Sequence, residues 1–186
     1  GRFPAALHDV VDVALSLSKE SSGPISIGGG SAGANLAAGA VLMLRDEGHR
    51  LPLSVVLGYG TFHAELPHSA GVEAELTGFL AKWAFNPTMT RRMNLNYVGD
   101  PALLVPGYAF PGGADLTGFP PSLLLNSRND RLRSSGEKFA VELGEAGTEV
   151  RQLTLPGTHA FFNAPKSKGF SEGITEAETW LRRFDG

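Results

Sequence analysis

The stretch of sequence that decides the fold is GGGSAGAN, residues 28–35. It follows the short apolar segment Ile25-Ser-Ile27 and opens a long alanine-rich helical pattern. A strand, a sharp glycine-flanked turn with a serine, and a helix form the setting of a nucleophile elbow, in which the serine hydroxyl stands exposed above a sheet. Ser31 is therefore the candidate nucleophile. We expect Gly29 and Gly33 at positions where a Cβ would collide with the tight turn.

A second interpretation of the same stretch is a phosphate or nucleotide loop, because residues 28–33 also fit Gly-x-Gly-x-x-Gly with Ser31 as a helix N-cap. The chain has no Gly-Lys-Ser/Thr motif, and Asp46 and Glu47 are only a generic match to the acid expected further along. With 24 glycines in the chain, the turn motif alone decides little. Polar residues further along the chain must discriminate between the two interpretations.

Two such residues follow segments that are predicted to be strands, the first of them buried. Asp130 comes just after the run that begins at Leu123, and His159 comes just after the segment 150–155. The order Ser, Asp, His, each after a separate strand, is that of the α/β-hydrolase triad. Asp130 could instead be a turn or capping acid, and His159 a turn histidine packed by neighbouring phenylalanines.

The remaining pattern alternates strands and helices, which predicts an α/β fold with a mostly parallel sheet. We expect helices at 4–19, from the elbow to about 47, at 135–146, and at the C-terminus with Trp180 on its apolar face. Strands are expected at 51–58, 122–126 and 149–155. Residues 62–115 interrupt the alternation with two predicted helices, 73–84 and 87–97. Phe79, Leu80, Trp83 and Phe85 in this insertion are expected mainly to pack.

Several motifs together resemble the hormone-sensitive-lipase-like group of α/β-hydrolases, which contains carboxylesterases and acylglycerol or short-chain lipases. They are FPAAL at 3–7, GGSAG at 29–33, GFPPS at 118–122, DRLR at 130–133 with Gly136, and HAF at 159–161. The resemblance implies cleavage of carboxylic esters, and the size of the 62–115 insertion with its several aromatic residues favours short to medium acyl chains. The resemblance assigns this chemistry to Ser31, His159 and Asp130 through an acyl-enzyme, with the Ala32 N–H in the oxyanion hole. It also implies that no metal or organic cofactor is used and that the 62–115 insertion lines the acyl pocket.

Three positions depart from the pattern of the group. Gly30 stands where many members have an acidic residue, Arg131 follows the acid where proline is common, and Ala160 follows the histidine where glycine is common. The group's His-Gly-Gly oxyanion motif has no counterpart before residue 28. We therefore expect residues 1–186 to be the C-terminal part of one hydrolase domain, without the usual N-terminal strands and feeble as an esterase on its own. A non-catalytic module that binds a small hydrophobic ligand is the alternative function.

Composition and charge limit the classes of protein and of partner that the chain can represent. The chain of 186 residues is 42% hydrophobic, which suits one domain with a single core. A net charge of −3 gives no basic footprint for nucleic acid, and the apolar run 37–44 is too short to span a bilayer. His63 and His68, expected beside the pocket or at the surface, lack carboxylates at convincing metal spacing beyond Glu65. The predicted partners are a small ester and either the missing N-terminal segment or a second copy of the chain; the default location is cytoplasmic.

Overall fold

The computed structural model describes residues 2–20 and 23–184. The first half contains α1 (Ala5–Glu20), β1 (Ser26–Gly30), α2 (Ala32–Asp46) and β2 (Ser54–Gly58), followed by the short helices α3 (Ala70–Glu75), α4 (Gly78–Trp83), α5 (Pro87–Val98) and the 3₁₀ turn η1 (Pro101–Leu103). The second half contains β3 (Ser122–Asn129), α6 (Arg133–Glu145), β4 (Val150–Thr158), the 3₁₀ turn η2 (Phe161–Asn163) and α7 (Lys168–Leu181).

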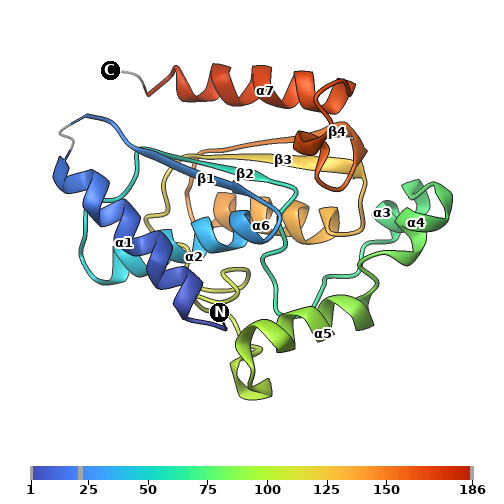
Figure 1. Ribbon diagram of the computed structural model, residues 1–186, viewed down its shortest axis with the longest axis horizontal. Helices are drawn as coiled ribbons and strands as arrows, with labels where there is room; N and C mark the ends of the chain where they lie inside the picture. Colours follow the sequence, from blue (N-terminus) through green and yellow to red (C-terminus); the bar gives the residue numbers. More distant parts are fainter. Residues whose placement is uncertain (1, 21–22, 185–186) are drawn as a thin grey trace.

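The four strands form one parallel sheet in the order β1-β2-β3-β4. Helix α7 covers one face, whereas α2 and α6 cover the other, with α1 packed against α2 (Figure 1). Because all strands are parallel, their carboxyl ends meet at one edge of the sheet, where parallel α/β folds place their ligands. The predicted parallel α/β architecture is confirmed.

The packing of strand β3 on both faces explains why its sequence is a continuous apolar run. Leu123 and Leu125 point into the cluster that contains Trp180 of α7. Leu124 points the other way, into the cluster with Phe139 and Leu143 of α6. A parallel strand covered by helices on both faces has no solvent-facing side, so its residues do not alternate between apolar and polar.

Strands β3 and β4 each extend three residues beyond their predicted ends at 126 and 155. The ladder continues through Asn126 paired with Thr154 and Ser127 paired with Leu155. Asn126 and Ser127 are buried although they are polar. Polar residues therefore concealed the end of β3, and the turn-forming pair Pro156-Gly157 concealed the end of β4; the extension places Asp130 and His159 directly at the two strand ends.

The predicted helix 73–84 is wrong, because the segment forms two helices instead. Leu76 is extended, with φ −65° and ψ 126°, and Gly78 has a left-handed φ of 77°. The expected packing of α4 is also wrong: the exposed fractions are 78% for Phe79, 75% for Leu80 and 54% for Trp83. Helix α4 lies at the periphery of the molecule (Figure 1), and these apolar side chains face the surroundings.

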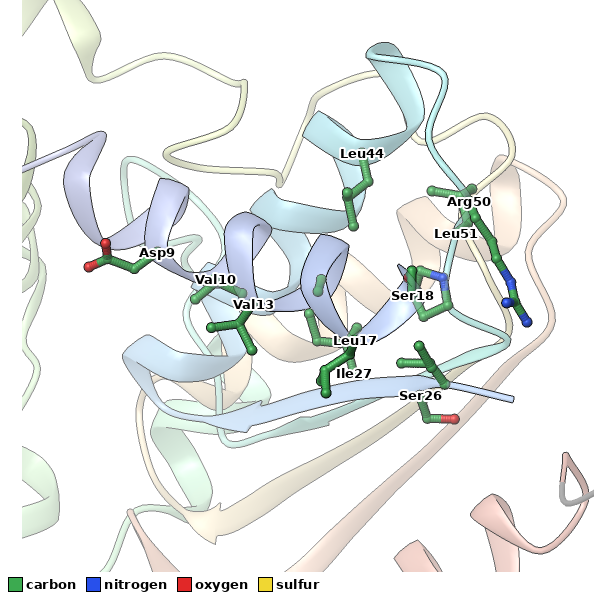
Figure 2. Close-up of a pocket in the computed structure, with 13 residues that line it drawn as sticks. Asp9, Val10, Val13, Leu17, Ser18, Ser26, Ile27, Leu44, Arg50 and Leu51 are labelled. Atoms are coloured by element: carbon green, nitrogen blue, oxygen red, sulfur yellow. The ribbon is translucent and has the colours of Figure 1, made fainter. Parts of the chain in front are cut away.

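Strand β1 lies at one end of the sheet, with β2 as its neighbour among residues 2–20 and 23–184. Beside it, a groove of about 350 Å³ runs between α1, β1 and residues 50–52 (Figure 2). Val13, Leu17 and Ile27 contribute to its mainly apolar lining. Ser31, Asp130 and His159 do not line this groove. Within the described ranges, no helix combines the length and apolar character needed to cross a membrane.

Candidate active site

The turn between β1 and α2 holds Ser31 in an unusual backbone conformation. Its φ of 56° and ψ of −123° lie where residues other than glycine are rarely found. The Ser31 N–H donates to the Gly58 carbonyl at 2.8 Å, which fixes the turn to β2. The Ser31 side chain makes no helix-capping hydrogen bond, unlike the N-cap serine of a phosphate loop. Its hydroxyl is therefore available to other partners.

The two glycines of the elbow differ in their surroundings. A Cβ on Gly29 would run into the backbone carbonyl of Gly33, so the strand can approach the helix only without a side chain at this position. A Cβ on Gly33 would meet no atom within 4 Å in the described parts of the chain. The predicted collision is confirmed for Gly29. It is wrong for Gly33, whose own backbone is what a Cβ on Gly29 would strike.

This difference predicts the effects of a matched pair of variants. Gly29→Ala should lower the free energy of unfolding by about 1–3 kcal/mol, since the obstacle is backbone that cannot move aside. Gly33→Ala should leave it unchanged or slightly higher, because alanine is the better helix former. Chemical unfolding of the two variants beside the wild-type protein measures the difference. Equal effects would show that the approach of Gly29 to α2 is not what constrains the turn.

The three predicted triad residues are in direct contact. Ser31 Oγ lies 2.9 Å from Nε2 of His159, and Nδ1 of the same ring lies 2.7 Å from Oδ2 of Asp130. The second carboxylate oxygen, Oδ1, accepts a hydrogen bond from the Leu132 N–H at 3.0 Å. Asp130 is only 3% exposed, so its orientation is well defined. Asp130 thus caps its own turn and also holds the imidazole.

Two aromatic rings enclose the His159 imidazole. Tyr59 approaches it edge-on, with ring centroids 5.3 Å apart, and Phe85 lies at 4.7 Å. Tyr59 also explains the departure at Gly30, because a Cβ on residue 30 would lie 2.7 Å from the Tyr59 hydroxyl oxygen. Burial raises the pKa of Tyr59, against a hydrogen bond from the Phe162 backbone, so the phenol remains neutral. No local sequence pattern predicts this neighbour of the elbow.

The other two departures also have structural consequences. Arg131 forms an ion pair with Glu73 at 2.9 Å and donates to the Lys82 carbonyl at 2.6 Å, which ties the turn after Asp130 to α3 and α4. Ala160 has a left-handed φ of 61°, a conformation that glycine adopts at lower cost. Glycine is common at this position because it adopts a left-handed φ without strain, whereas Ala160 holds the same turn in a strained backbone conformation.

Ala32 is the first residue of α2, directly after the serine. The first N–H groups of a helix have no partner within it and carry a partial positive charge. The Ala32 N–H thus lies beside Ser31 with the polarity needed to bind a developing negative charge. This placement agrees with the oxyanion position predicted from the sequence, whereas its role stays a prediction.

A cavity of about 280 Å³ opens beside Ser31 and Ala32. Much of its lining comes from the 62–115 insertion: Phe85, Thr90, Met93, Asn94, Tyr97 and Phe110. Burial raises the pKa of Tyr97, so its hydroxyl keeps its proton. A second cavity, of about 290 Å³, is lined by Asp130, His159 and residues of α4. Phe85 lines both cavities.

His63 is neither at the cavity nor at the surface, contrary to expectation. It is 6% exposed, with Nδ1 2.8 Å from the Ser135 hydroxyl and Nε2 3.2 Å from the Glu142 carboxylate. Burial lowers the pKa of His63, and the Glu142 carboxylate opposes that shift. His68 is exposed. Within residues 2–20 and 23–184 no cluster of three or more His, Cys, Asp or Glu side chains could hold a metal.

Comparison with known proteins places the chain in a family. Residues 1–163 match a family model described as alpha/beta hydrolase fold. The carboxylesterase NlhH of Mycobacterium tuberculosis is 29% identical over 160 residues, which cover 86% of this chain and 50% of NlhH. The chain thus spans about half the length of the curated relatives it matches.

Solved structures agree in fold. A hyperthermophilic esterase from the archaeon Pyrobaculum calidifontis superposes with a TM-score of 0.83 at 27% identity, over 95% of this chain and 60% of that one. An esterase of the bacterial hormone-sensitive lipase family gives a TM-score of 0.87 at 23% identity, over 100% of this chain and 62% of that one. The predicted resemblance to hormone-sensitive-lipase-like hydrolases is confirmed. The chain belongs to the alpha/beta hydrolase fold family.

Proposed function

We propose that the protein is a serine hydrolase that cleaves carboxylic esters through Ser31, His159 and Asp130. The observation that carries this proposal is the unbroken pair of hydrogen bonds from Ser31 Oγ through His159 to Asp130, at 2.9 and 2.7 Å. The relative that bears the name carboxylesterase supports the same reaction class. Cleavage of esters requires a nucleophile, a base and an anion-binding group, and each has a candidate here.

The roles follow from the protonation chemistry of serine. A serine hydroxyl is a weak nucleophile at neutral pH, so His159 Nε2 must accept its proton as Oγ attacks the ester carbonyl. Asp130 holds the Nδ1–H of the ring, which selects the reactive tautomer and stabilises the imidazolium. The Ala32 N–H binds the carbonyl oxygen as it becomes negative. His159 then returns the proton to the leaving alcohol, and water hydrolyses the acyl-enzyme by the same steps in reverse.

The two cavities suit the two parts of an ester. The leaving oxygen must face His159, which protonates it, so the alcohol lies on the side of the cavity lined by His159. The acyl group then extends into the cavity lined by Ser31 and Ala32. Its size of about 280 Å³ favours short to medium acyl chains. With this assignment, residues of the 62–115 insertion line much of the acyl pocket.

A series of 4-nitrophenyl esters from acetate to laurate tests the proposal on the natural protein. We expect kcat/KM to reach its maximum among short to medium acyl groups and to fall for the longest chains, since these exceed the cavity. A steady rise to laurate would contradict the assigned pocket. Binding of the esters without any release of 4-nitrophenol would favour the alternative, a non-catalytic module that binds small hydrophobic ligands.

A further inference from the structure

The cavity lined by His159 lies between two walls that come from distant parts of the chain. One wall is formed by α4 and the two residues after it, and it contributes Leu80, Ala81, Ala84 and Phe85. The other wall is the edge of the sheet where β3 and β4 end, and it contributes Asn129, Asp130, Arg131, Thr158 and His159. The width of the cavity therefore depends on where α4 is held relative to the sheet edge.

Helix α4 is not held in place by a buried apolar face. It has six residues, and in the described structure none of them is buried. Its large apolar side chains, Phe79, Leu80 and Trp83, are exposed. A helix of this length is unstable on its own in water, so contacts with the rest of the protein must fix its position. Several of the contacts that link α4 with the sheet edge are polar.

Hydrogen bonds cross from the sheet edge to both ends of α4. Asn129 makes two of them with Thr77, the N-cap of the helix: its Oδ1 accepts from the Thr77 N–H at 2.8 Å, and its Nδ2 donates to the Thr77 carbonyl at 3.0 Å. Near the other end of the helix, Nη2 of Arg131 donates to the Lys82 carbonyl at 2.6 Å. Asn129 and Arg131 both line the cavity from the opposite wall. These hydrogen bonds therefore fix the separation of the two walls.

Arg131 also binds the helix that precedes α4. Its Nη1 lies 2.9 Å from a carboxylate oxygen of Glu73 in α3, and the side chains of Arg131 and Glu73 are 12% and 38% exposed. We call the contacts with Glu73 and Lys82 the Arg131 bridge. Hydrogen bonds from a charged guanidinium are stronger than those between neutral groups, and its planar fork serves both partners at once. Proline, which is common at this position in the group, has no side-chain donor, so the bridge depends on a residue that departs from the group's pattern.

We propose that Arg131 restricts the alcohol part of the ester to small or slender groups, because its bridge holds α4 close to the turn of Asp130. This inference rests on the proposed function, since it takes the cavity lined by His159 as the alcohol side. Arg131 is a positioning residue: it acts through α4 and takes no part in bond cleavage. Without the bridge, Asn129 still holds the start of α4, but the end of the helix next to Phe85 moves outward more easily and the cavity admits a bulkier alcohol.

Two butyrate esters that differ only in the bulk of the alcohol test the proposal: ethyl butyrate and 1-adamantylmethyl butyrate. Both release a primary alcohol and form the same butyryl-enzyme, so the ratio of their kcat/KM values reports how the alcohol is accommodated during acylation. We expect the natural protein to prefer the ethyl ester by about tenfold or more. Arg131→Met keeps an unbranched side chain without the donors, and it should lower this preference about fivefold, chiefly by raising kcat/KM for the bulky ester.

Glu73→Gln and Arg91→Met complete the comparison. Glu73→Gln leaves Arg131 in place, so it should lower the preference by a smaller factor, and it should add little to Arg131→Met because both changes affect one contact. Arg91 pairs with Glu65 at 2.8 Å in the same insertion and, among the described residues, is not part of the lining of either cavity beside the triad. Arg91→Met should therefore leave the ratio unchanged. An unaltered preference in both Arg131→Met and Glu73→Gln would overturn the proposal, and so would an equal loss in Arg91→Met.

Hydrogen exchange measures how firmly α4 is held without any turnover. We expect the amides of residues 78–84 to exchange faster in Arg131→Met than in the natural protein, whereas Arg91→Met should leave them unchanged. Efficient hydrolysis of both esters, with the same exchange and the same preference in Arg131→Met, would reject the role of Arg131 and leave the esterase intact. Failure of the natural protein to hydrolyse either ester would instead overturn the proposed function and the alcohol specificity with it, and the exchange rates would still decide whether the Arg131 bridge holds α4.

Discussion

Ser31→Ala is expected to reduce kcat for a 4-nitrophenyl ester by about 10⁴- to 10⁶-fold. The Ser31 hydroxyl is the atom that would become acylated, and no other group takes its place 2.9 Å from His159 Nε2 in this variant. The KM should change little, because the acyl cavity and the Ala32 N–H remain. Steady-state kinetics on purified protein, with the burst of 4-nitrophenol as a second readout, measure the loss.

Ser171→Ala provides the control for the serine substitution. This serine is exposed on α7 and donates to the Lys168 carbonyl at 3.0 Å. Its replacement removes a hydroxyl of the same kind at a distance from the elbow, so kcat should remain at the wild-type level. Retention of substantial turnover by Ser31→Ala, with an intact fold, would mean that another group forms the acyl-enzyme.

Asp130→Asn should lower kcat by about 10⁴-fold while the fold is preserved. An asparagine can place its NH₂ toward Nδ1 of His159, which then accepts a hydrogen bond and carries its proton on Nε2. In that tautomer the ring cannot accept the proton of Ser31. The buried pair at 2.7 Å also stabilises the imidazolium, and the neutral amide loses this effect. Kinetics across neutral to alkaline pH measure the decrease.

Asp115→Asn and Asp100→Asn are matched controls, since both carboxylates lie in the 62–115 insertion. The Asp115 carboxylate accepts from the Thr117 N–H at 2.9 Å, and the Asp100 carboxylate accepts from the Ala102 N–H at 2.9 Å. Each serves a local turn and does not contact His159. Both variants should keep wild-type turnover. A loss of activity in either control as large as that of Asp130→Asn would contradict the assignment of the acid.

The fold and the candidate triad were accessible from the sequence because each signal is local. The elbow is a run of small residues after an apolar stretch, Asp130 follows the apolar run of β3, and His159 directly follows β4. In a parallel sheet, residues that follow separate strands are brought to the same edge. Chain order and strand position therefore sufficed to predict that these side chains meet.

Other features depend on contacts between distant segments and left no local pattern. The break between α3 and α4 results from an extended Leu76 and a left-handed Gly78, and neither residue type requires it. Tyr59 fills the space beside Gly30 from a different strand end. The buried contact of His63 with Glu142 spans 79 positions in sequence. Such long-range pairings follow from tertiary packing, which periodicity and turn chemistry do not encode.

The most direct test of the central claim is mass spectrometry of the natural protein after exposure to a fluorophosphonate probe. Such a probe reacts with a serine only where a base removes the hydroxyl proton and an anion site binds the phosphonyl oxygen. The account predicts one adduct per chain, located on the peptide that contains Ser31, and no adduct in His159→Ala. A folded protein that remains unlabelled, or an adduct on another serine, would contradict it.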